Sequence, residues 1–303
     1  MSLSALPRVF RLGALVLALI LGAVSLHSFQ LPATAWRALT QGWGGQGSAT
    51  GIATYRVSVE ARPIAGLHGD VSALTYDPDR NTLFTVTNKT PELVELSLKG
   101  EVLRRIALKG FEDPEAVEYL APGTYVISDE RRQRLVQVAM DATTIEIDAA
   151  QGHQFALGLG LNGNKGFEGL AYDSERKRLF VAKERDPVRI YEIHGFPLGG
   201  EGPVAIDVQE NPARDRGMNV RDLSSLQFDE RTGQLLVVSD ESRVIMALDM
   251  DGQPMGRLSL VAGSAGLKAK VPQAEGIAMD KAGRLYLVSE PNLFYRFDPL
   301  PAP

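Results

Sequence analysis

One pattern occurs five times in this 303-residue chain from residue 70 onward, and this internal repeat constrains the fold more than any other feature. Each copy has an apolar segment, a turn that usually begins with Asp, a second segment that ends in a polar or acidic residue, and a third apolar segment. The matching apolar positions lie 43, 53, 56 and 51 residues apart and are Leu74, Val117, Leu170, Leu226 and Ile277. This spacing, without strong helical periodicity, is typical of four-stranded propeller blades rather than of helical repeats.

The number of blades follows from how the copies begin and end. The last copy supplies only three strands before the chain ends, whereas residues 55–64 alternate in character ahead of the first copy. Pairing these two ends would provide the missing strand and remove an exposed sheet edge. We therefore predict an all-β fold, a five-bladed β-propeller over residues 52–300. A six-bladed ring is the alternative, but it would need a sixth copy of the motif that we do not find.

The first 28 residues have the pattern of an export segment. Arg8 and Arg11 precede an uncharged apolar run at 12–26, as in the basic and hydrophobic regions of a secretory signal. That run is shorter than the roughly 20 residues that a spanning helix normally needs. We predict a hydrophobic helix at 1–28 that is either a cleaved signal peptide or a membrane anchor. Residues 29–51, rich in Gly, Ala, Thr and Gln, are predicted to form a flexible linker.

The composition excludes several kinds of site. Without cysteine, the chain cannot form disulfides, thiolate zinc sites or a cysteine nucleophile. Its 37 acidic and 32 basic residues give a formal net charge of -5, and removal of residues 1–26 takes away two arginines and no acid. Nucleic-acid binding requires a concentrated basic surface, so we expect no nucleic-acid partner.

Polar residues recur at two matching positions of the five copies. In an antiparallel hairpin the start of the first strand lies beside the end of the second, so both positions fall at the same end of every blade, beside the central channel. The first column is Ser72, Glu115, Glu168, Ser224 and Glu275, and the second is Asn88, Asp129, Glu184, Asp240 and Glu290. Two carboxylates about 5 Å apart repel by roughly 3 kcal/mol at an effective dielectric constant near 20, so this cluster needs cations or protons to neutralise it.

Both the protein and a bound metal offer such cations. Lys183 and Arg185 would neutralise the carboxylates from within, and Ca²⁺ would do so because hard cations prefer oxygen ligands. The predicted metal ligands are Glu168, Glu184, Asp240, Glu275 and Glu290. The residues predicted to bind a small ligand are Ser72, Asn88, Glu115, Asp129, Lys183, Arg185 and Ser224. The alternative is that these side chains only cap strands and form ion pairs at a solvated channel entrance.

Several segments carry a resemblance to a known family. They are GFEDPE at 110–115, LNGNKGFEG at 161–169, AKERDP at 182–187, QAEG at 273–276 and SEPNLF at 289–294. Together they resemble the SdiA-regulated protein family, over about residues 52–299. The resemblance implies a β-propeller in the bacterial cell envelope, either anchored in the inner membrane with the propeller in the periplasm or released into the periplasm after cleavage. The family name reports how one member is regulated and assigns no reaction.

Two hypotheses of function follow. The first is an envelope binding or sensing module, rather than an enzyme, that presents the acidic channel mouth to a small ligand, a cation or a partner protein. The second is a Ca²⁺-dependent hydrolase of an ester, a lactone or a phosphoester, in which the metal polarises an oxygen and activates water. A more distant similarity to phytase-like and lactonase-like propellers implies the second, but no catalytic residue can be carried over from them.

Overall fold

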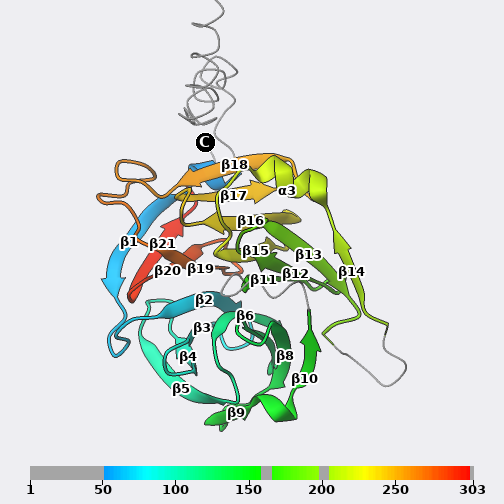
Figure 1. Ribbon diagram of the computed structural model, residues 1–303. Coiled ribbons are helices and arrows are strands. Elements are labelled where there is room, and N and C mark those ends of the chain that lie inside the picture. The colour runs from blue at the N-terminus through cyan, green and yellow to red at the C-terminus, as the bar shows by residue number, and fades with distance from the viewer. Residues whose placement is uncertain (1–50, 158–165, 198–204, 301–303) are drawn as a thin grey trace, which may run out of the picture. The chain divides into compact units, whose positions relative to one another are not determined.

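The computed structural model describes residues 51–157, 166–197 and 205–300, which fold into five β-sheets arranged around a common centre (Figure 1). The first strand of each repeat lies nearest the centre. These inner strands, which contact one another in a closed cycle, are β2, β6, β11, β15 and β19. The fold is therefore the five-bladed propeller that the repeat predicts, and not the six-bladed alternative.

In every blade the three inner strands follow one another in the sequence. Blade 1 comprises β2 (Val71–Asp77), β3 (Thr82–Thr87), β4 (Glu92–Leu96) and β5 (Val102–Lys109), with β9 (Glu146–Asp148) parallel to β5. Blade 2 comprises β6 (Pro114–Ala121), β7 (Thr124–Asp129), β8 (Arg134–Ala139) and β10 (His153–Ala156). Blade 3 comprises β11 (Phe167–Asp173), β12 (Arg178–Lys183), β13 (Arg189–His194) and β14 (Asp207–Glu210). Blade 4 comprises β15 (Ser225–Asp229), β16 (Gln234–Ser239), β17 (Val244–Leu248) and β18 (Pro254–Ser259). Short helical segments are η2 (Gly51–Thr54), η3 (Ala149–Gln151) and α3 (Pro212–Met218).

Blade 5 joins strands from both ends of the described chain. It comprises β19 (Ala274–Met279), β20 (Leu285–Ser289), β21 (Leu293–Asp298) and β1 (Arg56–Pro63). β1 pairs antiparallel with β21, from Arg56 opposite Asp298 to Pro63 opposite Leu293. The N-terminal strand thus supplies the fourth strand predicted from residues 55–64, and main-chain hydrogen bonds close the ring and cover the edge of β21.

Apolar side chains from facing blades form the core. The rings of Phe84 in blade 1 and Tyr125 in blade 2 meet edge to face, with centroids 5.2 Å apart. Those of Phe180 in blade 3 and Phe228 in blade 4 stack at 5.9 Å. All four are buried, and each buried side chain of this kind contributes about 1.5–3 kcal/mol. The repeated apolar positions therefore hold the blades together, and the polar positions at the strand ends are left for the channel.

The predicted N-terminal segment lies outside the described residues. This applies to the hydrophobic helix, signal peptide or anchor at 1–28 and to the linker at 29–51 apart from its last residue. In the part of the chain that the structure describes, no helix combines the length and apolar character needed to cross a membrane.

Candidate functional site

The polar columns meet at one end of the central channel, where the inner strands begin. There they enclose a cavity of about 290 Å³, which we call the acidic pocket. Ten of the twelve predicted site residues line it, namely Ser72, Asn88, Glu115, Glu168, Glu184, Arg185, Ser224, Asp240, Glu275 and Glu290. They come from all five blades, so the pocket depends on the closed ring.

Irregular strand pairing positions three of these carboxylates. The registers of β6, β11 and β19 shift at the stretches that contain Glu115, Glu168 and Glu275. Such bulges take a side chain out of the regular alternation and are frequent beside functional sites. A Cβ atom at Gly276 would lie 2.2 Å from the carbonyl carbon of Ala73 in the next inner strand. The two residues of the repeated Glu-Gly pair therefore have different roles. The bulge redirects the glutamate carboxylate, and the glycine allows two neighbouring blades to approach closely.

Carboxylates far outnumber cationic groups around the acidic pocket. Its lining includes one guanidinium, Arg185, and eight carboxylates, those of Glu115, Glu168, Glu184, Asp222, Asp240, Glu241, Glu275 and Glu290. Arg185 forms ion pairs of 2.8 Å with both Glu184 and Glu241. Its Nε atom is buried and has no hydrogen-bond acceptor among the described residues. Because one guanidinium cannot neutralise eight carboxylates, most of this charge is left for protons or a bound cation.

Burial and mutual repulsion raise the pKa of these carboxyl groups. Burial, followed by repulsion from Glu290, raises the pKa of Glu275 to about 8. Burial is also the main reason that the pKa of Glu115 rises to about 7. The pKa of Glu168 lies well above its ordinary value because the group is buried and faces Glu184. A cation entering the pocket near neutral pH would therefore compete with protons.

Three acidic side chains beside the acidic pocket approach one another closely enough to share an ion. One carboxylate oxygen from each of Asp113, Glu115 and Glu130 lies within 4.8 Å of the other two. Of these, only Glu115 was predicted as a site residue, and it was predicted to bind a ligand rather than a metal. Among the described residues, the five predicted metal ligands form no group this close. The acidic group that could hold a metal ion thus differs from the predicted one.

Unlike the other ten predicted site residues, Asp129 and Lys183 do not line the acidic pocket. Asp129 is fully buried, accepts a hydrogen bond from the Asp113 N–H at 3.2 Å and pairs with Arg134 at 2.8 Å. The Lys183 ammonium donates to the main-chain carbonyls two and three residues further along the chain. Each charge is held by local partners, which the alignment of the repeats could not show.

Three residues that the two columns omit also line the acidic pocket: Asp222, Glu241 and Gln273. Two of them belong to a third column, two positions before the first, whose polar members are Asp70, Asp113, Asp222 and Gln273. The Asp222 carboxylate accepts hydrogen bonds from the Ser239 hydroxyl and, at 3.1 Å, from the Glu241 N–H. The signal was present in the repeat, but a polar residue just before a strand resembles an ordinary turn residue.

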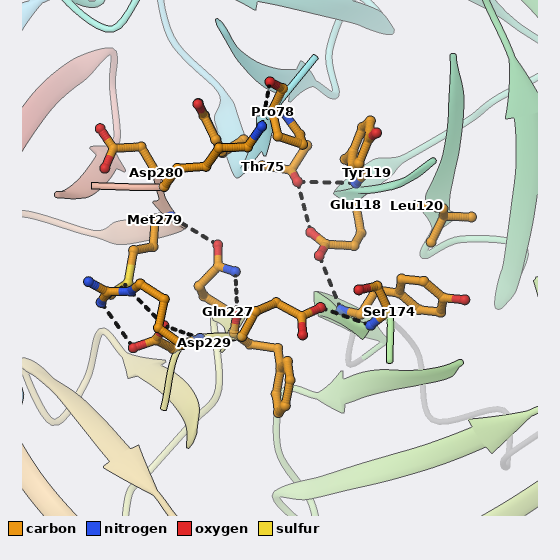
Figure 2. A pocket seen from close by; sticks show the side chains of 16 residues that line it. Thr75, Pro78, Glu118, Tyr119, Leu120, Ser174, Gln227, Asp229, Met279 and Asp280 are labelled. Carbon is orange, nitrogen blue, oxygen red and sulfur yellow. Dashed lines mark hydrogen bonds and ion pairs between the residues drawn. The ribbon is translucent and has the colours of Figure 1, made fainter. Parts of the chain in front are cut away.

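A second cavity, of about 330 Å³, lies where the same inner strands end (Figure 2). We call it the aromatic pocket. Matching positions of the five blades contribute Tyr76, Tyr119, Tyr172, Phe228 and Met279 to its lining. Its charged residues are Glu118, Asp229, Glu230, Arg231, Asp280 and Lys281. None of the predicted site residues lines this pocket, so sequence reasoning missed it.

Known proteins share the sequence pattern and the fold of this chain. The sequence model of the SdiA-regulated family matches residues 48–298. Glutaminyl cyclase from Myxococcus xanthus is similar in structure, with a TM-score of 0.52 and 16% identity over 81% of this chain and 97% of that chain. The luciferin-regenerating enzyme has a TM-score of 0.50 and 14% identity over 81% and 96%. A gluconolactonase from Xanthomonas campestris has a TM-score of 0.47 and 15% identity over 76% and 72%. At these identities the likeness to solved structures shows the propeller fold alone.

Proposed function

The chain belongs to the SdiA-regulated family, and we propose that its propeller is a binding module of the bacterial envelope whose acidic pocket takes up a cation. The charge balance of the pocket carries this proposal, because eight carboxylates face one guanidinium around a cavity of about 290 Å³. Carboxylates crowded in this way cost free energy unless a proton or a cation neutralises them. The envelope location rests on the export segment expected at 1–28, whether it is cleaved or kept as an anchor.

Calcium suits the oxygen donors at the edge of this pocket. Ca²⁺ binds oxygen atoms at about 2.4 Å, so two of its ligands are at most about 4.8 Å apart. The carboxylate oxygens of Asp113, Glu115 and Glu130 satisfy this limit. These three groups would supply part of the roughly six to eight oxygens that Ca²⁺ takes, and water or an oxygen-bearing ligand would supply the rest.

Thermal unfolding of the purified full-length chain tests cation binding. We expect Ca²⁺ at about 100 times its dissociation constant to raise the melting temperature by roughly 5 °C, and EDTA to reverse the rise. Spermidine serves as the organic-cation probe. The double variant Glu115→Gln, Glu130→Gln removes two of the three carboxylates that lie close enough to share an ion, so it should lose most of the response. The matched control Glu175→Gln removes a carboxylate that is 79% exposed and outside the pocket, so it should respond like the parent chain.

The outcomes of this experiment are distinct. A rise with Ca²⁺ or with spermidine that depends on Glu115 and Glu130 supports the proposal. If neither probe changes the melting temperature, or if the double variant responds as strongly as the control, the acidic pocket does not bind cations and its carboxylates are structural.

A Ca²⁺-dependent hydrolase is the second candidate, and the group formed by Asp113, Glu115 and Glu130 favours it. A metal held there would polarise a substrate oxygen and activate water. In that case p-nitrophenyl acetate, a δ-lactone or p-nitrophenyl phosphate should be hydrolysed, and both EDTA and Glu115→Gln should abolish the hydrolysis. Stabilisation by Ca²⁺ without turnover of any of the three substrates would leave the binding module as the function.

A further inference from the structure

The aromatic pocket takes no part in the function proposed above. We propose that it is a second binding site, for a small organic cation such as a protonated aromatic amine. Its volume of about 330 Å³ lies within the usual range of small-molecule sites, roughly 300–1,000 Å³. The proposal is carried by a buried carboxyl group in the wall of the pocket, by the aromatic side chains around it and by the charges at its rim.

Glu118 is a buried carboxyl group whose hydrogen-bond partners are all neutral. It is 6% exposed, and Figure 2 shows its side chain pointing from β6 toward the middle of the pocket, across from Gln227. Its oxygens accept hydrogen bonds from the Thr75 hydroxyl at 2.8 Å and from the Tyr172 main-chain N–H at 3.1 Å. Among the described residues, no cationic side chain forms an ion pair with it.

The fold does not require a carboxyl group at this position. Gln227 is the matching residue of blade 4, and its Oε1 accepts the Met279 N–H at 3.0 Å, just as Glu118 accepts the N–H of the blade that follows it. Thr75 makes the same bond in blade 1, with a hydroxyl oxygen and a distance of 3.1 Å. A neutral oxygen is therefore sufficient to link neighbouring blades. Burial raises the pKa of Glu118 to about 8, so a carboxyl group costs free energy that an amide would avoid.

Aromatic residues contribute to the lining of the same cavity as this carboxyl group. Tyr76, Tyr119, Tyr172 and Phe228 come from four successive blades, and all line the cavity. The face of an aromatic ring carries negative potential, so rings that line a pocket attract ammonium groups and disfavour anions. A carboxyl group together with aromatic walls therefore matches a ligand that joins a positive charge to an apolar body.

The basic groups of the pocket are already engaged, so they do not reverse this preference. Arg231 pairs with Asp229 at 3.0 Å, and the Lys281 ammonium donates to the Pro78 carbonyl at 3.1 Å. The remaining charged groups are Glu230, which accepts the Ser174 N–H at 2.9 Å, and Asp280, which pairs with Arg284 at 3.5 Å. Because arginines pair with Asp229 and Asp280, the balance is left to Glu118 and Glu230 against Lys281, and this excess of acidic groups favours a cation.

Three probes of nearly equal shape and different charge test the proposal: benzylamine, benzyl alcohol and benzoate. Calorimetric titration of the full-length chain at pH 7.5 should show one saturable site for benzylamine. Benzyl alcohol should bind about tenfold or more weakly, because it forms no charged hydrogen bond, and benzoate should show no saturable binding. Equal affinities for the amine and the alcohol, or tighter binding of benzoate, would overturn the proposal.

Substitutions locate the bound amine. Glu118→Gln keeps the oxygen that accepts the Tyr172 N–H, as Gln227 does in blade 4, so the variant should fold and bind benzylamine only as weakly as benzyl alcohol. The control Glu175→Gln removes an exposed carboxylate that does not line the pocket and should leave the affinity unchanged. Tyr172→Leu keeps the wall apolar but removes the aromatic ring, so it should weaken the binding of benzylamine several-fold more than that of benzyl alcohol.

Two further readouts separate this site from the acidic pocket. Benzylamine should displace the Glu118 proton, so the heat of binding should depend on the ionisation enthalpy of the buffer for the parent chain and not for Glu118→Gln. Glu275→Gln, at the other end of the channel, should bind benzylamine with unchanged affinity. If Glu275→Gln abolishes binding while Glu118→Gln keeps it, the amine occupies the acidic pocket and the aromatic pocket is not a cation site.

Discussion

The two ends of the central channel are built from the same five strands but hold their acidic side chains in opposite ways. Where the inner strands end, four of the five blades place an aspartate at the hairpin turn: Asp77, Asp173, Asp229 and Asp280. Each accepts hydrogen bonds from main-chain N–H groups of its own turn. Where the strands begin, eight carboxylates line the acidic pocket with one guanidinium, that of Arg185, which pairs with two of them. What separates a structural acid from a candidate ligand group is therefore its set of partners, not its place in the repeat.

Strand β11 contains one carboxyl group of each kind. Asp173, at its end, is buried, which alone would raise its pKa, but the Arg176 N–H and the Arg178 guanidinium donate to it and hold the pKa below the ordinary value. Glu168, near the start of the strand, is buried against other carboxylates, and its pKa is raised well above the ordinary value. The pKa values of these two carboxyl groups, five residues apart on one strand, are thus shifted in opposite directions. One end of the strand has cationic and N–H donors, whereas the other has mostly acidic neighbours.

The largest expected effect is on the pH dependence of stability. Burial is the main cause of the raised pKa values of about 7 for Glu115 and about 8 for Glu118 and Glu275. In the unfolded chain these groups ionise near pH 4.5, so their stabilising contribution is complete below that pH and is lost as the pH rises through 7 to 8. At about 1.4 kcal/mol per pKa unit, and discounting for partial exposure, the free energy of unfolding should fall by roughly 5 kcal/mol between pH 5 and 8.

Urea unfolding in EDTA at a series of pH values measures this decline. Saturating Ca²⁺ should make it shallower, because a bound cation replaces the protons in the acidic pocket. If the free energy of unfolding in EDTA does not change between pH 5 and 8, the pKa values of these three carboxyl groups are not raised in the folded chain. If the decline is the same with and without Ca²⁺, it comes from Glu118 and from carboxyl groups that bind no ion.

A matched pair of substitutions on β11 should give the next largest effect, with opposite signs at its two ends. Asp173→Asn should lower the free energy of unfolding by about 2 kcal/mol, because it removes one of the two carboxylates, Asp173 and Glu192, that pair with the Arg178 guanidinium, which is 13% exposed. Glu168→Gln should raise it by about 1–2 kcal/mol in EDTA at pH 7.5, because it removes repulsion. Urea unfolding of both variants checks this. Loss of stability in both would show that Glu168 is as structural as Asp173.

The sequence predicted the ring and most of the acidic pocket for one physical reason. A blade repeats its strands at a fixed spacing, so equivalent residues in different copies occupy equivalent places, and columns such as Glu168 and Glu275 converge when the ring closes. The strand at 55–64 could be identified in the same way, because a blade with three strands leaves an edge that must be covered.

The other features of the two pockets could not be predicted, because they depend on side-chain partners that alignment of the repeats does not show. Asp129 lies in a column, yet Arg134 holds it away from the pocket. Glu130 comes next in the chain and joins the close acidic group only because the loop before β6 brings Asp113 near. The aromatic pocket was missed because a residue such as Tyr172 looks like core in the sequence, and the alternation of a strand does not show where the core stops and a cavity begins.

The smallest expected effect concerns a neutral member of the first column, Ser224. Its side chain lines the acidic pocket, but its hydroxyl donates to the Ala274 carbonyl of blade 5 at 2.6 Å, so this group is already committed to holding two blades together. Ser224→Ala should therefore cost about 1 kcal/mol, the usual value of one hydrogen bond, and leave the Ca²⁺-induced rise in melting temperature unchanged. A weaker Ca²⁺ response in this variant would mean that the hydroxyl contributes to ion binding despite its bond to blade 5. In that case the partners that a side chain already has would not be enough to separate the structural from the functional members of the columns.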